Sequence, residues 1–152
     1  MNILIDTNIL LNMVRVKRND KLESFINPNQ VSLFTTVANE AEAKSIGIRN
    51  GWGIEKFLKL DTVLETMDVI EITQSYIQTY VEIDTFSQRS NRNFLNYDFD
   101  TPRNMGKNDL WIAAVASLLG LELITTDNDF DHLHNIFLEV RIIKTEELRQ
   151  FF

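Results

Sequence analysis

Four acidic residues stand at the ends of apolar segments that read as strands, or at the starts of predicted helices. They are Asp6, Glu40, Asp109 and Asp127. In a parallel sheet the carboxyl ends of all strands lie at one edge, so Asp6, Glu40 and Asp127 should approach one another there. Asp109 joins them if the helix that it opens begins at the same edge. Clustered carboxylates repel, and either protonation or a bound cation relieves that repulsion.

The chemistry that these residues permit is metal-assisted hydrolysis. A site of carboxylate oxygens without histidine or cysteine suits Mg²⁺ or Mn²⁺. Such an ion polarises a phosphodiester, lowers the pKa of a bound water and stabilises the departing oxygen. The two histidines, His132 and His134, lie late in the chain and close together, where we expect them at the surface.

Each acid taken alone also has a purely structural explanation. Asp6 is suited to capping the helix that follows it, and Asn108 with Asp109 is good capping chemistry as well. Glu40 in a first helical turn is favoured by the helix dipole, and Asp127 is typical of a turn. The convergence of all four on one predicted edge is what favours a site.

The elements that would position these acids alternate between strands and helices. Strands are predicted at residues 2–5, 31–34, 68–72, 122–125 and 140–143. Helices are predicted at residues 7–15, 20–26, 37–50, 54–67, 73–90 and 109–119, with a short one at 130–134, and residues 91–106 are predicted to be a long loop. This alternation predicts an α/β fold with a mostly parallel sheet and helices on both of its faces.

Length and composition indicate one ordered domain over residues 1–152, because 44% of the residues are apolar. The chain has no cysteine, as expected of a protein in the reducing cytoplasm. No apolar run approaches the roughly 20 residues that a membrane span needs. We expect no signal peptide, since no basic segment precedes the first apolar run and Asp6 interrupts that run.

The net charge of −7 has the wrong sign for a typical nucleic-acid binder, whose affinity comes from neutralising phosphates. Two segments differ from this average. Residues 15–21 hold four basic residues and one acid, and residues 86–107 hold four basic residues and two acids. The distribution of charge is therefore more informative about partners than the sum.

Four segments resemble the PIN-domain ribonucleases, and specifically the VapC-type toxins of type II toxin–antitoxin pairs. They are ILIDTNILL at residues 3–11, NEAEAKSIG at 39–47, GKNDLWIAAVA at 106–116 and LITTDNDFDHL at 123–133. The segments follow the order of the family and together span almost the whole chain. The resemblance implies a three-layer α/β/α fold with about five strands in a mostly parallel central sheet.

The resemblance also implies roles for the acids. Asp6 and Asp109 would be the main Mg²⁺ ligands, and Glu40 and Asp127 would complete the cluster, partly through water. Glu42 competes with Glu40 because the middle motif is loose, and Asp129 competes with Asp127. Whether the site holds one metal ion or two stays open.

Further residues are expected at the substrate. Asn8 and Thr126 match the polar positions beside the first and fourth acids, and Arg103 and Lys107 offer positive charge to an RNA backbone. The implied reaction is in-line attack of a metal-activated water on an RNA phosphodiester, which leaves a 5′-phosphate and a 3′-hydroxyl. The family implies a homodimer and a small antitoxin whose tail fills the acidic groove.

Three other functions compete with this hypothesis. A PIN nuclease of RNA processing would share the same acids without an antitoxin, and a non-catalytic PIN-like scaffold would bind RNA or protein. A phosphoacceptor receiver domain is also a small α/β fold, but it needs an aspartate at the end of its middle strand. The third predicted strand ends at Ile72 and Thr73, with no aspartate there.

Overall fold

The computed structural model describes residues 1–152, and its centre is a five-stranded sheet. The strands are β1 (Ile3–Ile5), β2 (Leu33–Thr36), β3 (Asp68–Ile70), β4 (Glu122–Thr125) and β5 (Glu139–Ile142). Their order is β3-β2-β1-β4-β5, and every neighbouring pair is parallel. The predicted parallel sheet of about five strands is confirmed, with β1 at its centre and the β1 and β4 carboxyl ends side by side.

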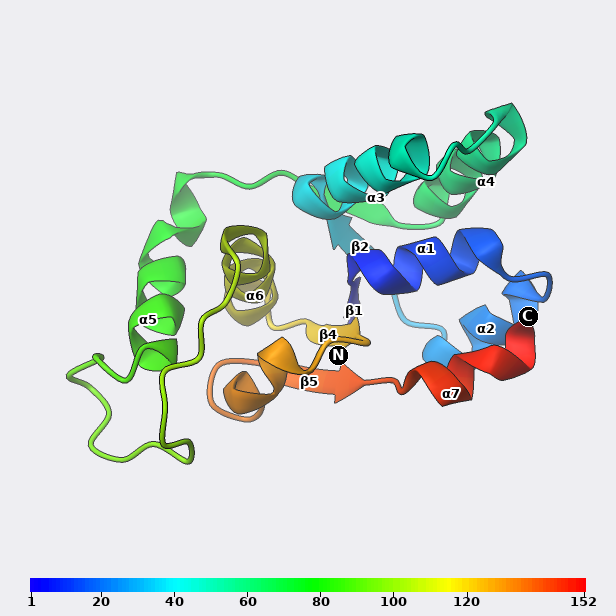
Figure 1. The fold of residues 1–152 in the computed structure, drawn as a ribbon. Helices are drawn as coiled ribbons and strands as arrows, with labels where there is room; N and C mark the ends of the chain where they lie inside the picture. The colour runs from blue at the N-terminus through cyan, green and yellow to red at the C-terminus, as the bar shows by residue number, and fades with distance from the viewer.

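Helices cover both faces of the sheet, as the three-layer prediction requires (Figure 1). The helices are α1 (Thr7–Arg15), α2 (Asn19–Ile26), α3 (Val37–Arg49), α4 (Ile54–Glu65), α5 (Ile77–Ser87), α6 (Lys107–Leu119) and α7 (Thr145–Leu148), with 3-10 turns η1 (Gln74–Tyr76), η2 (Asn128–Leu133) and η3 (Arg149–Phe151). Figure 1 shows α5 and α6 on the left of the sheet and α1, α2, α4 and α7 on the right. None of these helices combines the length and apolar character that a membrane crossing requires.

The core consists of two apolar clusters, one on each face of the sheet. Successive side chains of a strand point to opposite faces, so Leu4 enters the cluster with α5 and α6, while Ile3 and Ile5 enter the cluster with α1 and α4. All three β1 residues are buried. The central strand is therefore held rigidly from both sides, and so is the acid that follows it.

Helix boundaries differ from the sequence prediction at two places near functional residues. Asn108 was expected to cap the helix that starts at Asp109, but this is wrong: α6 begins at Lys107 and its N-cap is Gly106. Asp109 is therefore inside the first helical turn, where its charge meets the positive end of the helix. The predicted helix 73–90 is split into η1 and α5 and ends at Ser87.

Residues 91–106 form a loop without helix or strand, as predicted, but the loop is packed rather than loose. Phe94, Tyr97 and Phe99 surround Phe86 of α5 with ring centroids 4.7, 5.3 and 5.5 Å away. The Tyr97 hydroxyl donates to the carbonyl of Asn91 and accepts from its N–H. This small aromatic core fixes the path by which the chain reaches α6.

Candidate metal centre

Asp6 lies between β1 and α1, and it is 5% exposed. Its Oδ1 accepts hydrogen bonds from the Thr7 N–H at 2.8 Å and from Asn39 Nδ2 at 3.2 Å. Its Oδ2 accepts from the Thr125 hydroxyl at 2.6 Å. Burial raises the pKa of Asp6, although the bonds from Thr125 and Thr7 oppose that rise. Asp6 is thus both the N-cap of α1 and a carboxylate whose charge is held at the sheet edge.

Asn39 and Thr125 are two residues that sequence analysis did not assign to the site. Asn39 forms a capping box with Thr36 at the start of α3, and its side chain also donates to Thr7 Oγ1 at 3.0 Å. Thr125, the last residue of β4, is fully buried. The spacing of Thr36 and Asn39 is a capping-box pattern that the sequence does contain, but its contact with Asp6 depends on the fold.

Of the two candidate glutamates on α3, Glu42 lies beside Asp109, and both residues line the same recess. Residues three apart share a helix face, so Glu42 lies on the same face of α3 as the buried Asn39. The charge of Glu42 contributes to the raised pKa values of both Asp6 and Asp109, whereas that of Glu40 does not. Glu40 instead pairs with Lys44 one turn along the helix, at 2.8 Å. The structure therefore favours the alternative that the sequence left open.

Asp109 opens toward the other acids from the first turn of α6. Burial raises its pKa to about 7, and the nearby charges of Asp6, Asp127, Glu42 and Asp129 add to the rise. Together with Lys107 and Glu42 it lines a recess of about 460 Å³. The assumption that α6 begins at the same edge as the strand ends is thus borne out by its position.

Asp127 and Asp129 complete the cluster from the turn after β4. Asp127 caps η2 by accepting the N–H of Asp129 at 2.8 Å, and its own N–H donates to Thr125 Oγ1 at 3.0 Å. One carboxylate oxygen from each of Asp109, Asp127 and Asp129 lies within 4.8 Å of the others. Both Asp127 and Asp129 lie close to Asp109. The structure therefore keeps both of the candidates that the sequence offered.

The predicted substrate-binding residues fall into two groups. Asn8 and Lys107 are exposed and Thr126 is half-buried, and each lies within two positions of a cluster acid in the chain. Arg103 is already engaged within the protein, because its Nη2 contacts Asp131 Oδ1 at 2.7 Å and donates to the Asn128 carbonyl at 3.0 Å. Its guanidinium therefore holds η2 to the 91–106 loop.

The expectation of two surface histidines is wrong for His132. Its ring is parallel to Phe86 at a centroid distance of 6.3 Å, and its Nε2 lies 2.7 Å from the Ser87 hydroxyl. Burial and the positive charge of Arg103 lower the pKa of His132 to about 4. The aromatic loop residues, which the sequence did not pair with η2, create this environment. His134 is exposed.

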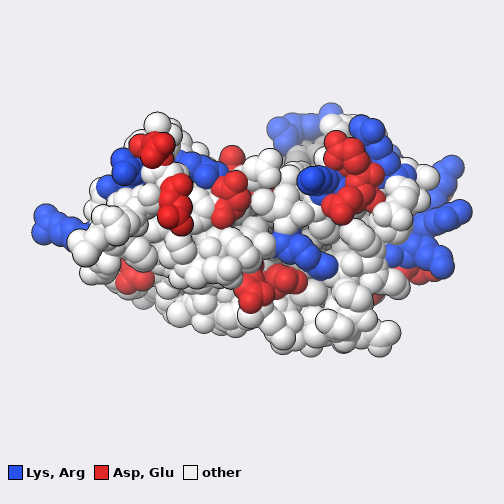
Figure 2. Space-filling model, turned by 90° about the horizontal axis from the view of Figure 1, so that it is seen from below, with Lys and Arg blue, Asp and Glu red and all other residues white.

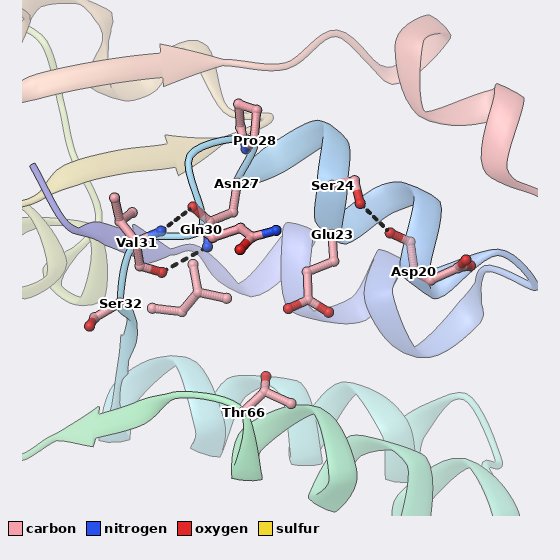
Figure 3. A pocket seen from close by; sticks show the side chains of 10 residues that line it. Asp20, Glu23, Ser24, Asn27, Pro28, Gln30, Val31, Ser32 and Thr66 are labelled. Atoms are coloured by element: carbon pink, nitrogen blue, oxygen red, sulfur yellow. Dashed lines mark hydrogen bonds between the residues drawn. The ribbon is translucent and has the colours of Figure 1, made fainter.

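A second hollow lies elsewhere in the molecule. It measures about 650 Å³ and lies between α2 and the end of α4, near the residues that lead into β2 (Figure 3). Asn27 and Val31 exchange two hydrogen bonds in its wall. None of the cluster acids lines it, so it is separate from the candidate centre.

The donor set of the cluster fits a hard divalent cation. It offers carboxylate oxygens and no nitrogen or sulfur ligand, which is the chemistry of Mg²⁺ and Mn²⁺ sites. Burial, together with the charges of neighbouring carboxylates, raises the pKa values of Asp6 and Asp109 and so disfavours their ionised forms. A cation bound at this point would remove that repulsion.

Comparisons with known proteins agree with the fold. The sequence model of the PIN domain matches residues 3–135. No curated protein matches the chain in sequence. Among solved structures, VapBC2 from Rickettsia felis, bound to a promoter DNA fragment, superposes with a TM-score of 0.74 at 18% identity, covering 95% of this chain and 100% of that one.

Two further solved structures share the fold. VapBC-1 from nontypeable Haemophilus influenzae has a TM-score of 0.69 at 19% identity, with 93% of this chain and 98% of that chain covered. VapC20 from Mycobacterium tuberculosis, described as a toxin that cleaves the sarcin–ricin loop, has a TM-score of 0.64 at 15% identity, with 92% and 99% covered. The similarity extends over nearly the full length of each chain.

Proposed function

Because the chain belongs to the PIN-domain family, whose members are nucleases, we propose that it is a Mg²⁺-dependent endoribonuclease, the toxin of a toxin–antitoxin pair. The observation that carries this proposal is the convergence of acids from four separate elements on one sheet edge. They are Asp6, Glu42, Asp109, Asp127 and Asp129. In this proposal, residues 1–152 form a single domain that carries the site at this edge.

The chain's own residues prepare the site for a phosphodiester. Thr7, Asn39 and Thr125 hold both oxygens of Asp6 in fixed positions. Asp109 faces Asp6 from the start of α6, where the positive end of the helix favours an anion. Side chains held in place before substrate binds are what a preorganised site uses to lower a reaction barrier.

A bound Mg²⁺, or Mn²⁺, would supply the charge that ionises these acids, acidify a water and stabilise the departing oxygen. Asp6 and Asp109 are the proposed main ligands, and Asp127, Asp129 and Glu42 close the site around them. The products would carry a 5′-phosphate and a 3′-hydroxyl.

Polar side chains at the rim would bind the RNA. Asn8 and Lys107 are exposed beside the acids, and Thr126 is half-buried at the end of β4. The Asn8 amide, the Lys107 ammonium and the Thr126 hydroxyl can each donate hydrogen bonds to phosphate oxygens. The carboxylate oxygens then remain available to the metal ion. We assign Lys107, Asn8 and Thr126 to this role and move Arg103 to the support of η2.

The solved structures of the same fold support the proposals that the substrate is RNA and that the chain binds a protein partner. VapC20 is described as a toxin that cleaves the sarcin–ricin loop, and several of the other structures are toxin–antitoxin complexes. For this chain we propose a homodimer and a small antitoxin that places a basic side chain among the carboxylates. An antitoxin cation at this point would satisfy the same charge requirement as a metal ion.

Cleavage of labelled single-stranded RNA by the purified protein tests this function. We expect cleavage with Mg²⁺ or Mn²⁺, none with EDTA, and products with 5′-phosphate ends. Asp6→Asn should reduce the rate at least about 100-fold, within the range for lost electrostatic stabilisation of a transition state. Asp61→Asn, an exposed acid of α4, is the matched control and should cleave normally. Equal cleavage by Asp6→Asn, or cleavage in EDTA, would contradict the proposal.

A further inference from the structure

Helix α1 exposes a single polar stripe that starts beside the acidic cluster. Of its residues, Asn8 and Arg15 are exposed and Asn12 is half-buried, while the remaining six are buried. These three positions follow the spacing of one helix face. Asn12 Nδ2 donates to the Asn8 carbonyl at 2.7 Å, which leaves the Asn8 side chain free to face solvent. The stripe is about 10 Å long, from the rise of an α-helix over seven residues.

The stripe ends in a basic cluster that the proposed chemistry does not use. The cluster consists of Arg15, Lys17, Arg18, Lys21 and Arg149, all of them exposed. The Arg18 N–H donates to the Phe151 carbonyl at 3.4 Å, and Phe25 packs against Phe151 at 5.5 Å, so η3 brings Arg149 to the α2 end. Figure 2 shows basic side chains gathered at the right end of the molecule, the end that holds α2 and α7 in Figure 1.

No member of this cluster forms an ion pair within the protein. The three ion pairs of the structure involve Lys44, Arg103 and Arg141 instead. Asp20 is the one acid within residues 15–21. Of the two glutamates on α7, Glu147 accepts the N–H of Lys144. A concentrated basic surface on a chain with net charge −7 is a local feature and no consequence of composition.

From this geometry we infer that a single-stranded RNA runs along α1, from the cleavage site at Asp6 to the basic cluster. The inference rests on the proposed function and names the path of its substrate. Asn8 and Asn12 donate to phosphate or sugar oxygens, and the basic cluster neutralises the backbone beyond them. At 3.4 Å per stacked nucleotide, the stripe spans about three nucleotides.

A protein partner is a weaker match to this surface than RNA. Along α1 the stripe carries two asparagines and an arginine and no exposed apolar side chain, and the exposed Phe25 and Phe152 lie beyond it, near the basic cluster. Amide and guanidinium groups are instead typical contacts to a phosphodiester backbone. An antitoxin in this position would also have to be acidic there, whereas the proposed antitoxin inserts a basic side chain among the acids.

Salt-dependent binding of a fluorescein-labelled single-stranded RNA tests the path. The protein carries Asp109→Asn, so that the probe is bound without being cleaved. On that background, Arg15→Gln/Lys17→Gln should weaken binding about tenfold or more at 50 mM salt and reduce the slope of log K against log salt by about 1.4, for two lost phosphate contacts. The matched control Arg49→Gln/Lys56→Gln removes the same charge from exposed residues of α3 and α4 and should leave the slope unchanged.

The outcomes separate this path from the function itself. An unchanged slope for Arg15→Gln/Lys17→Gln, with RNA cleavage intact in the otherwise native protein, overturns the path and leaves the nuclease proposal standing. Equal losses in both double variants indicate net charge alone and overturn the path as well. If the native protein neither binds nor cleaves RNA, both proposals are wrong. If Arg15→Gln/Lys17→Gln loses antitoxin binding but binds RNA normally, the surface binds a protein instead of RNA.

Discussion

At the residue scale, Asp6 combines a structural role with a chemical one. It caps α1 and receives hydrogen bonds from Thr7, Asn39 and Thr125, yet its burial raises its pKa. Removing the side chain relieves charge repulsion but leaves buried donors without a partner. The second effect dominates, because each unsatisfied buried group costs about 1–3 kcal/mol and a lost cap about 1 kcal/mol.

Asp6→Ala should therefore destabilise the protein as well as inactivate it. We expect the free energy of unfolding to fall by about 2 kcal/mol, which lowers Tm by roughly 4–8 °C. Asp61→Ala on the exposed face of α4 is the control and should change Tm little. An unchanged Tm for Asp6→Ala in metal-free buffer would mean that the buried hydrogen bonds contribute nothing to folding.

Asp109→Asn should have the opposite effect on stability. The pKa of Asp109 is about 7 in the folded protein and 3.8 without its environment, so the folded state keeps a proton that the unfolded state loses. The stability of the wild type consequently falls as pH rises from about 4 to about 7. The variant lacks this loss, and its Tm in EDTA should exceed that of the wild type by a few degrees above pH 7, at about 2–4 °C per kcal/mol.

The pH dependence of that difference is its test. Thermal melts from pH 4 to pH 8 should show a gap between Asp109→Asn and wild type that is small at pH 4 and widest above pH 7. A gap of constant size across this range would show that Asp109 titrates near its ordinary pKa, with no repulsion from the other acids.

Glu42 and Glu40 give a matched pair of variants on one helix. Glu42 faces the cluster and Glu40 pairs with Lys44, so only Glu42→Gln should weaken metal binding. We expect the Mg²⁺ concentration for half-maximal cleavage to rise about 10–100-fold in Glu42→Gln, as for residues that support metal ligands, and to stay unchanged in Glu40→Gln. The reverse result would restore the sequence-based assignment of Glu40.

At the scale of elements, the 91–106 loop and η2 act as one support for the acids after β4. Arg103 joins them by contacting Asp131 and the Asn128 carbonyl, and its own N–H donates to the Ser87 carbonyl at 2.7 Å. Burial lowers the pKa of His132, and the positive charge of the nearby Arg103 lowers it further. Removing these contacts of Arg103 should make the turn that carries Asp127 more mobile.

Arg103→Met tests these contacts with two readouts. The affinity for Mg²⁺ should fall about tenfold, as for other supports of metal ligands, with partial recovery in Arg103→Lys. The pKa of His132, followed by NMR, should rise from about 4 because a nearby positive charge is lost. A raised KM for RNA with unchanged metal affinity and an unchanged His132 pKa would show instead that Arg103 contacts substrate.

Much of the fold at this scale was predictable from the sequence. Short apolar runs located all five strands, and helical periodicity located the longer helices. Gly120 ends α6 in the left-handed conformation expected of a helix stop, at φ +65°. The C-terminal pieces α7 and η3 were not predicted, because four and three residues are too short for a periodic pattern. The prediction of Asn108 as the N-cap was wrong because α6 begins at Lys107, with Gly106 as its N-cap.

The candidate site was only partly predictable for a physical reason. Alternation of strands and helices brings Asp6 and Asp127 to one edge whatever the details of packing. Which glutamate faces that edge depends on the rotation of α3, and in the observed rotation the Asn39 side chain reaches Asp6. The burial of His132 likewise depends on loop residues far away in the sequence, which no local pattern reveals.

At the scale of the whole molecule, charge is separated between two surfaces. Acids gather at the carboxyl edge of the sheet, and unpaired basic residues gather at the far end of α1. In the proposed function, the acidic edge binds a divalent cation, and the basic end binds the RNA backbone that the acids would otherwise repel. Under the proposed function, this separation would let a chain with net charge −7 bind a polyanion.

Binding of Mn²⁺, followed by the EPR signal of the free ion, tests the metal centre most directly. The native protein at pH 7.5 should remove Mn²⁺ from solution saturably, and Mg²⁺ should displace it. Asp109→Asn should bind at least about tenfold more weakly while remaining folded, and Asp61→Asn should bind like the native protein. Equal Mn²⁺ binding by the native protein and Asp109→Asn would contradict the assignment of these carboxylates to a metal centre.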